Sequence, residues 1–223
     1  MIELKKYNFN ISEIFYSIQG EGTRAGLPCV FVRLQGCRLR CSWCDTPYAL
    51  EINQQETLMT GAEIIEKIKS YGCNFVEFTG GEPFEQADIH HVMQFLADEG
   101  FVVAVETSGY IDLAFADKRI IKILDVKCPD SGMSKKNKYE NFEYLTKIDE
   151  VKFVIADRAD YEFAKDICNK YSLEKKCDSI LFSPVFGKVE NLELAEWILA
   201  DRLNVRMQVQ MHKYIWHPEK RGV

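Results

Sequence analysis

The sequence predicts an α/β fold: a partial, laterally open (β/α) TIM-like barrel with about six parallel strands. Short apolar runs rich in β-branched and aromatic residues recur along the chain, with amphipathic helical stretches between them. The run 120–124 is almost continuously apolar, which suits a parallel strand that is covered on both faces. The strand–helix units number fewer than the eight that close a full barrel, so we expect an open one.

Each expected strand is a short apolar run bounded by turn residues. The first expected helix opens with Thr60 and Glu63 in the spacing of a capping box, and Ile64, Ile65 and Ile68 then fall on one face. Because strands and helices alternate, we expect right-handed crossovers within one parallel sheet. The expected strands are 29–34, 75–79, 101–106, 120–126, 151–155, 179–182 and 205–210, and the expected helices are 60–71, 88–99, 159–171 and 192–202.

Composition and charge limit the class of protein. The 223 residues, 47% of them apolar, suffice for one sizeable core, and we expect a single domain over 1–223. The formal net charge of −6 argues against a general nucleic-acid-binding surface. No apolar run approaches the roughly 18 residues that span a bilayer. The N-terminus also lacks the apolar stretch of a secretory signal, so we expect a cytoplasmic protein that does not contact membranes.

Residues with useful chemistry follow several of the expected strands at their carboxyl ends. In parallel α/β folds, functional sites collect at this rim. The polar segment 128–138 is expected to be a mobile flap beside it. The rim elements, in chain order, are a cysteine-rich loop, Thr79-Gly80-Gly81-Glu82-Pro83, Thr107-Ser108-Gly109, Lys127-Cys128-Pro129 and Ser183-Pro184-Val185-Phe186.

Three cysteines, Cys37, Cys41 and Cys44, lie within eight residues, and no fourth follows at close spacing. Outside a secreted protein, such a group indicates metal binding or redox chemistry. Structural zinc and electron-transfer clusters usually take a fourth protein ligand, and the histidines lack zinc-finger spacing. Three thiolates on a four-iron cluster would leave one iron open to a substrate or cofactor. A non-catalytic iron–sulfur carrier and a zinc-stabilised binding module remain alternatives.

With Trp43 between the last two cysteines, the motif Cys-x-x-x-Cys-x-aromatic-Cys resembles the signature of radical S-adenosylmethionine enzymes. The resemblance implies a [4Fe-4S] cluster on Cys37, Cys41 and Cys44, with S-adenosyl-L-methionine on the open iron. One electron then cleaves the sulfonium to a 5′-deoxyadenosyl radical, which needs a desolvated pocket. The Gly-Gly-Glu-Pro element is the second match, and it implies that Gly81 and Glu82 bind the methionine amino group.

Three further stretches, 14–22, 31–37 and 44–46, are similar to the 7-carboxy-7-deazaguanine synthases of the queuosine pathway, and the similarity extends over nearly the whole chain. That resemblance implies ring contraction of 6-carboxy-5,6,7,8-tetrahydropterin to 7-carboxy-7-deazaguanine with release of ammonia. It also implies a Mg²⁺ ion, a homodimer and a flavodoxin- or ferredoxin-like electron donor.

The resemblance also implies roles for individual residues. Arg33 would pair with the pterin carboxylate, and Thr46 would bind the Mg²⁺ that orients it. The other pterin-binding residues would be Ile18, Gln19, Gly20 and Thr79. The adenosylmethionine would lie along Trp43, Cys44, Asp45, Gly81, Glu82, Ser108, Asp125, Val126, Lys127, Ser183, Pro184, Val185 and Phe186.

The stretch 125–127 departs from the family, because Asp-Val replaces the Ser-Pro that many members carry before the lysine. An Asp-x-Lys element also resembles glycyl-radical enzyme activating enzymes, which are the alternative function. Arg33, Thr46 and the stretch 14–22 favour the synthase, since an activating enzyme must admit a protein loop. Arg33 also has a plainer interpretation, as an edge charge paired with Glu21 or Asp45. The C-terminal stretch 217–223 is expected to close over the pterin.

Overall fold

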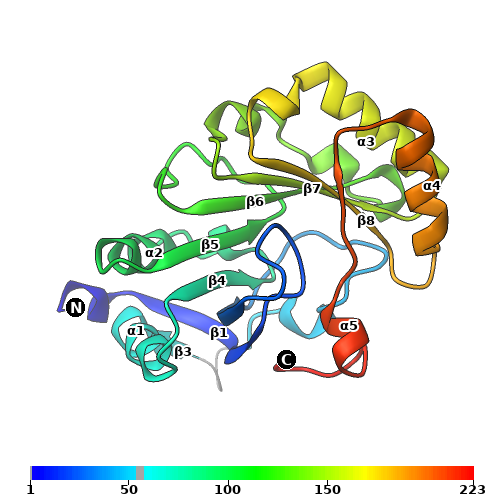
Figure 1. The fold of residues 1–223 in the computed structure, drawn as a ribbon. Helices are drawn as coiled ribbons and strands as arrows, with labels where there is room; N and C mark the ends of the chain where they lie inside the picture. Colours follow the sequence, from blue (N-terminus) through cyan, green and yellow to red (C-terminus); the bar gives the residue numbers. More distant parts are fainter. Residues whose placement is uncertain (1, 54–57) are drawn as a thin grey trace.

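A computed structural model describes residues 2–53 and 58–223, and all of the strands described there belong to one sheet (Figure 1). The sheet order is β3-β1-β2-β4-β5-β6-β7-β8-β9. Its two end strands do not pair with each other in the described residues, so the predicted open (β/α) barrel is confirmed. The parallel strands are β2 (Pro28–Leu34), β4 (Phe75–Gly80), β5 (Val102–Thr107), β6 (Ile121–Val126), β7 (Glu150–Ile155), β8 (Ser179–Pro184) and β9 (Arg206–Met207).

The sheet also contains a long strand that was not expected. β1 (Asn8–Ile18) runs antiparallel to β2, and its residues 8–10 pair with the short β3 (Leu58–Thr60). The pairing with β2 shifts between Ile11 and Glu13, in a β-bulge. A bulge inserts one extra residue and breaks the alternation of apolar and polar side chains. Without a regular alternation of apolar and polar residues, the sequence pattern does not predict a strand here.

The last expected strand is wrong in length. Over 205–210 only β9 (Arg206–Met207) pairs with β8, and the chain then leads into the short helix α5 (His212–Ile215). The side-chain amides of Gln208 and Gln210 donate to the Glu21 carboxylate at 3.1 and 3.0 Å. These contacts draw the chain across the rim of the sheet and away from the strand ladder.

The four longer helices begin and end within one residue of the expected ranges and cover the outer side of the sheet (Figure 1). Thr60 and Glu63 form the expected capping box, with the Glu63 carboxylate accepting from the Thr60 amide at 2.7 Å. No helix within the described residues is long and apolar enough to cross a membrane. These helices are α1 (Gly61–Ser70), α2 (Ile89–Asp98), α3 (Arg158–Tyr171) and α4 (Asn191–Asp201).

The two faces of the sheet differ in chemistry although both are covered. Successive side chains of a strand point to opposite faces. On the outer face, residues such as Val76 and Phe78 join the main apolar core beneath the helices. On the inner face a small apolar cluster lies at the beginning of the strands, and charged side chains follow it towards their carboxyl ends. The charged strand residues of the inner face that line the cavity are Arg33, Glu77, Glu106, Asp125 and Lys152.

One charged pair lies away from this inner face. Lys122 interrupts the apolar run of β6, and its ammonium lies 3.0 Å from Asp149, with both side chains almost fully buried. The Asp149 carboxylate also accepts from the backbone amides of Lys122 and Thr146 at 2.7 and 2.6 Å. This single carboxylate therefore joins β6 to the turn that precedes β7.

We expect Asp149→Ala to lower the free energy of unfolding by about 3–5 kcal/mol, because it leaves a buried lysine without its counter-charge. Urea unfolding followed by circular dichroism measures this change. The control is Glu99→Ala, which removes the exposed partner of Lys69 and should cost no more than about 1 kcal/mol. Equal losses for the two variants would show that the buried pair does not stabilise the fold.

Candidate active site

A cavity of about 310 Å³ opens at the carboxyl ends of the parallel strands, where the sequence predicted the rim. Its walls come from β1 and β2, the cysteine loop, the ends of β4 to β7, and the C-terminal residues. The predicted site residues that line it are Ile18, Gln19, Gly20, Arg33, Cys37, Cys41, Trp43, Cys44, Asp45, Thr46, Thr79, Gly81, Ser108, Asp125, Lys127, Val185 and Phe186.

Four predicted site residues lie outside the cavity wall: Glu82, Val126, Ser183 and Pro184. Val126 belongs to the apolar core beneath the helices, because the alternation that points Asp125 inward points its neighbour outward. Ser183 and Pro184 are buried at the end of β8, where they pair with β7. A cofactor in the cavity would contact the two residues that follow, Val185 and Phe186.

The Glu82 carboxylate is fully buried and holds two loops of the rim together. It accepts hydrogen bonds from the Thr107 hydroxyl at 2.7 Å and from the Ser108 hydroxyl and amide at 2.6 and 2.9 Å. These donors are the last residue of β5 and the residue that follows it, so the carboxylate faces that strand end and not the cavity. The predicted direct contact between Glu82 and an ammonium therefore has no support here. Glu82 instead orients Ser108, which does line the cavity.

The neighbouring glycines bring the cysteine loop and the loop after β4 into close contact. A β-carbon on Gly81 would lie 2.1 Å from the carbonyl oxygen of Gly36. The Glu82 amide donates to that same carbonyl at 2.7 Å. The amide of Cys37, one residue further on, donates to the Leu50 carbonyl at 3.0 Å. A side chain at residue 81 would push the cysteine loop outwards, which explains the Gly-Gly pair.

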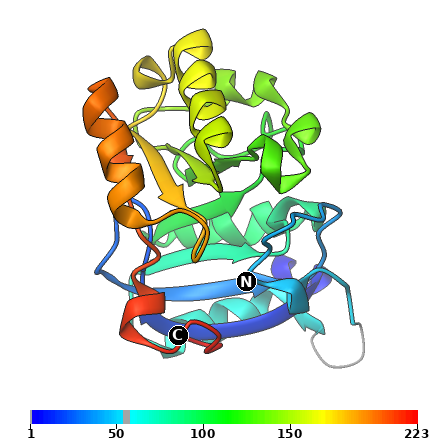
Figure 2. The same cartoon turned by 90° about the vertical axis from the view of Figure 1, so that its right-hand side faces the viewer.

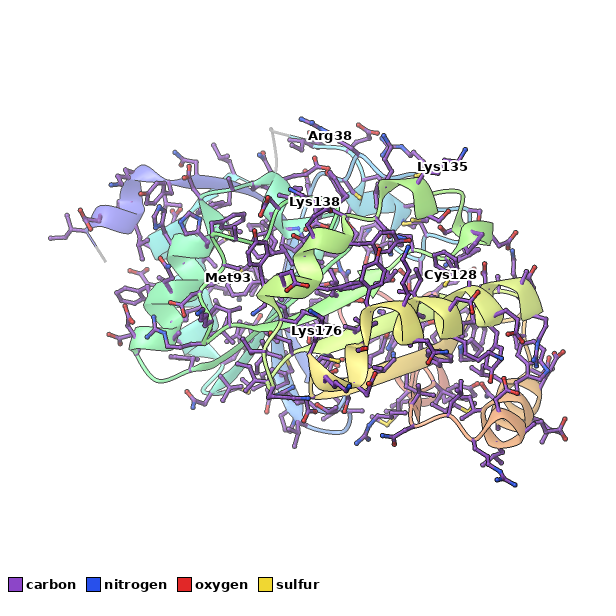
Figure 3. All side chains as sticks on the ribbon, turned by 90° about the horizontal axis from the view of Figure 1, so that it is seen from above. Arg38, Met93, Cys128, Lys135, Lys138 and Lys176 are labelled. Atoms are coloured by element: carbon purple, nitrogen blue, oxygen red, sulfur yellow. The ribbon has the colours of Figure 1, made fainter. Side chains whose placement is uncertain are left out.

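The segment 128–138, expected as a mobile flap, is instead built into the fold. It contains two 3-10 helices, Pro129–Ser131 and Ser134–Lys136, and Ser131 is buried. The Ser42 amide donates to the Ser131 carbonyl at 3.1 Å, which ties the segment to the cysteine loop. Figure 3 shows Arg38 of the loop and Lys135 of the segment on the same side of the molecule. The segment therefore supports the loop from outside.

The three cysteine thiols share the cavity wall and are all partly buried. Burial raises the pKa of Cys37 to about 11 and also raises the pKa of Cys41. Thiols of this kind lose their protons when a metal binds. No three His, Cys, Asp or Glu side chains in the described residues are already gathered as a metal site. The soft donor set and the shared wall fit a cluster, and its binding would draw the thiols together.

A network of buried charges at the inner end of the cavity was not predicted. The ammonium of Lys152 pairs with Glu106 and lies 3.0 Å from Glu21 and 3.8 Å from Asp125. Burial alone would lower the pKa of Lys152, but Glu106, Glu21 and Asp125 outweigh it and raise that pKa. The sequence does contain an indication of this network, because Glu77 and Lys152 are charged residues inside otherwise apolar strands. Such a charge has to face an interior that can satisfy it.

Asp125 and Lys127 form the part of this network that is closest to the cysteine loop. The Lys127 ammonium lies 2.8 Å from one carboxylate oxygen of Asp125. The other oxygen, Oδ1, is buried and has no hydrogen-bond partner among the residues that the structure describes. A buried acceptor without a donor is costly. A ligand hydroxyl or ammonium in the cavity would satisfy it, so Asp125 fits the predicted role beside adenosylmethionine.

Arg33 and Thr46 also line the cavity. Arg33 is partly buried, and its Nε lies 2.9 Å from Glu13, so the alternative pairing with Glu21 or Asp45 is wrong. The Thr46 hydroxyl lies 4.0 Å from the Cys44 sulfur and faces the same cavity. Thr46 also precedes a 3-10 turn that begins at Pro47. Its place in the turn and its place in the cavity wall are therefore compatible.

The C-terminal stretch lies beside β1 and forms one side of the cavity (Figure 2). Gly20 permits this arrangement, because a β-carbon there would lie 2.5 Å from Nδ1 of His212. The close approach that this glycine allows is therefore to the chain's own C-terminal helix. The Met211 amide donates to the Gly20 carbonyl at 3.0 Å. Residues 218 and 220–223 line the cavity, so the closure of 217–223 over the pterin stays a prediction that this arrangement fits.

An open parallel barrel with three cysteines and a glycine pair at its rim defines a radical S-adenosylmethionine protein. Residues 31–131 match the model of the Radical SAM superfamily. The chain is 46% identical to the 7-carboxy-7-deazaguanine synthase of Chlorobaculum tepidum, over 96% of this chain and 97% of that protein. It is 42% identical to that of Koribacter versatilis, over 96% and 99%. The chain belongs to the 7-carboxy-7-deazaguanine synthase family.

A solved structure shows the same fold. The crystal structure of QueE from Escherichia coli superimposes with a TM-score of 0.77 at 24% sequence identity, covering 95% of this chain and 98% of that one. At this level of identity the similarity concerns the fold, and it agrees with the open, mostly parallel sheet described above.

The free energy of unfolding should depend on pH through Glu77, whose carboxyl group accepts a hydrogen bond from the side-chain amide of Gln19. Burial, together with Glu106 and Glu21, raises the pKa of Glu77 well above its ordinary value of 4.5. The folded protein then keeps a proton that the unfolded chain releases. The stability this contributes is complete below pH 4.5 and is lost as the pH rises through the folded pKa.

We therefore expect the Glu77→Gln variant to be more stable than the native protein above pH 4.5. The difference in the free energy of unfolding should grow by up to about 1.4 kcal/mol for each pH unit, until the pKa of Glu77 in the folded protein is passed. Urea unfolding at several pH values between about 5 and 8 measures this gain. Glu66→Gln, at an exposed position of α1, should show no such trend. If the difference in stability between Glu77→Gln and the native protein does not change with pH, Glu77 is already ionised in the folded protein.

Proposed function

We propose that this protein catalyses the ring contraction of 6-carboxy-5,6,7,8-tetrahydropterin to 7-carboxy-7-deazaguanine with release of ammonia. The observation that carries the proposal is one cavity whose wall contains the cysteine loop together with Arg33, Thr46 and Gln19. The first feature suits a radical source, and the other three suit an anionic pterin. A [4Fe-4S] cluster with bound S-adenosylmethionine would supply the hydrogen-abstracting radical.

The chain's own residues would hold the cofactor by several contacts. Cys37, Cys41 and Cys44 would ligate the cluster and leave one iron open, since the described residues place no further cysteine or histidine on this loop. The unpaired oxygen of Asp125 would accept from the adenosylmethionine. Lys127 carries a positive charge beside Cys41, which lies among the groups that act on its pKa. That charge would favour an anionic cluster.

The substrate would lie in the part of the cavity that Arg33, Thr46 and Gln19 line. Arg33 offers a planar guanidinium that suits a carboxylate in a two-bond fork. Thr46 would contribute a hydroxyl to a Mg²⁺ ion shared with that carboxylate. Ile18, Gln19, Gly20 and Thr79 would form the pterin pocket, and Gln19 is oriented there by the Glu77 carboxyl.

The alternative function, activation of a glycyl-radical enzyme, is not favoured. An activating enzyme must admit a protein loop to the radical. Here the residues 218 and 220–223 line the cavity, and Arg221 lies over the ring of Tyr48 at 3.6 Å. That side is therefore occupied by the protein's own C-terminal stretch, which suits a small-molecule substrate.

Four further expectations belong to this proposal. We propose that residues 1–223 act as a single domain, which the one continuous sheet supports. We also propose a cytoplasmic homodimer that receives electrons from a flavodoxin- or ferredoxin-like protein. The exposed cysteine-loop residue Arg38 and its neighbour Arg40 would lie near such a donor.

The reaction itself is the first test. Anaerobically reconstituted protein, supplied with carboxytetrahydropterin, S-adenosylmethionine, magnesium and a reductant, should release ammonia and a deazapurine, detected by chromatography and mass spectrometry. Adding S-adenosylmethionine should change the electron paramagnetic resonance spectrum of the reduced cluster. Cys41→Ala should abolish both signals. Hydrogen abstraction from a partner protein's glycine, with no deazapurine, would refute the proposal.

The role of Thr46 is a second test. Thr46→Ala should lower magnesium-dependent turnover by at least about tenfold, since even outer-shell partners of a metal cost that much when removed. Thr46→Ser keeps the hydroxyl and should retain most of the activity. Iron content should match the native protein in both variants. An equal loss of iron and turnover would assign Thr46 to the cysteine loop and not to magnesium.

A further inference from the structure

Glu13 receives two hydrogen bonds on a single carboxylate oxygen. Its Oε1 accepts from Nε of Arg33 at 2.9 Å and from the hydroxyl of Tyr48 at 3.0 Å. These residues come from β1, β2 and the 3-10 helix after the cysteine loop, and they are brought together only in the folded chain. The side chains of Glu13 and Arg33 are 17% and 16% exposed, so water competes little for this contact.

The contact uses only one of the three nitrogens of Arg33. Its two terminal nitrogens have no hydrogen-bond or ion-pair partner within residues 2–53 and 58–223, and the side chain lines the cavity. A guanidinium held through Nε keeps its two-nitrogen edge available for a carboxylate. Gly80 lies beside it, since a β-carbon there would lie 2.3 Å from the Leu34 carbonyl oxygen and 3.0 Å from Cγ of Arg33.

Tyr48 is itself held in place from a different part of the chain. The guanidinium of Arg221 lies 3.6 Å from the centroid of the Tyr48 ring, in the range of a cation–π contact. Burial, reinforced by Glu13, raises the pKa of Tyr48, so its hydroxyl keeps the proton that it donates. Glu13 therefore remains the acceptor of the hydrogen bonds from Tyr48 and Arg33.

We propose that Glu13 and Tyr48 are positioning residues for Arg33, and that they present its two terminal nitrogens to the carboxylate of the substrate. The inference rests on the proposed function, because it takes the ligand of Arg33 to be the pterin carboxylate. Without Glu13 and Tyr48, Arg33 would adopt several rotamers and lose affinity through the cost of ordering its long side chain. The contribution is therefore to binding of the substrate and not to the chemical step.

The test measures equilibrium binding of carboxytetrahydropterin to cluster-reconstituted protein with the cluster oxidised, so that no turnover occurs. Arg33→Ala should raise the pterin Kd by about 10- to 100-fold, as expected for a lost charge-assisted pair. Tyr48→Phe and Glu13→Gln should each raise it by about 3- to 10-fold. The Kd for S-adenosylmethionine and the iron content should stay unchanged in all three variants.

Tyr71→Phe is the matched control. It also removes a tyrosine hydroxyl that hydrogen-bonds to β1, in this case to the Ile14 carbonyl at 2.9 Å, but Tyr71 does not line the cavity. It should leave the pterin Kd unchanged. When Tyr48→Phe is added to Arg33→Ala, the Kd should rise no further, since residues that act through one partner are not additive. In steady state, Tyr48→Phe should raise the pterin KM and leave kcat nearly constant.

The possible failures are distinguishable. If the native protein binds the pterin and makes the product while Tyr48→Phe and Glu13→Gln bind it as well as the native protein does, the positioning role is refuted and the function stands. An additive loss in the Arg33→Ala background would also refute it. If the native protein neither binds nor converts the pterin, the proposed function fails, and the inference that rests on it fails as well.

Discussion

The inner side of this protein depends on the ion pairs between the Lys152 ammonium and the buried carboxylates around it. The ammonium stands among the carboxylates of Glu21, Glu106 and Asp125, which come from three different segments of the rim. Without a cation at their centre, these buried carboxylates would repel one another and draw water into the barrel. The pairing therefore lets a polar cavity exist at the ends of otherwise apolar strands.

The cysteine loop depends on a second constraint, which is steric. The backbone at Gly81 lies so close to the Gly36 carbonyl that no side chain fits between them. On its other side the loop is hydrogen-bonded to the segment that contains Ser131. The loop is therefore held between two structured segments, and its three thiols keep to one wall of the cavity. The Glu82 carboxylate contributes by joining the loop after β4 to the end of β5.

Most of the architecture was predictable because it follows from local patterns. Helix α1 has its capping box and its apolar face within eleven consecutive residues, 60–70, and strands such as β6 are short apolar runs. β1 escaped prediction because its bulge breaks the alternation. Among the site residues, the three cysteines and the residues between Trp43 and Thr46 line the cavity, whereas Glu82 of the Gly-Gly-Glu-Pro motif does not. Val126, Ser183 and Pro184 do not, because their direction depends on strand parity and pairing across the sheet.

The sequence by itself determined the alternation of the longer helices with the parallel strands, the cysteine motif and the family, since each of these is encoded in neighbouring residues. Only the tertiary structure decided which side chains meet. Glu13, Arg33 and Tyr48 lie on separate elements, and Arg221 joins them from almost the end of the chain. The spacing of these residues along the sequence does not predict their contacts. These contacts arise because the mostly parallel sheet brings the carboxyl ends of its parallel strands to one rim, beside the antiparallel β1.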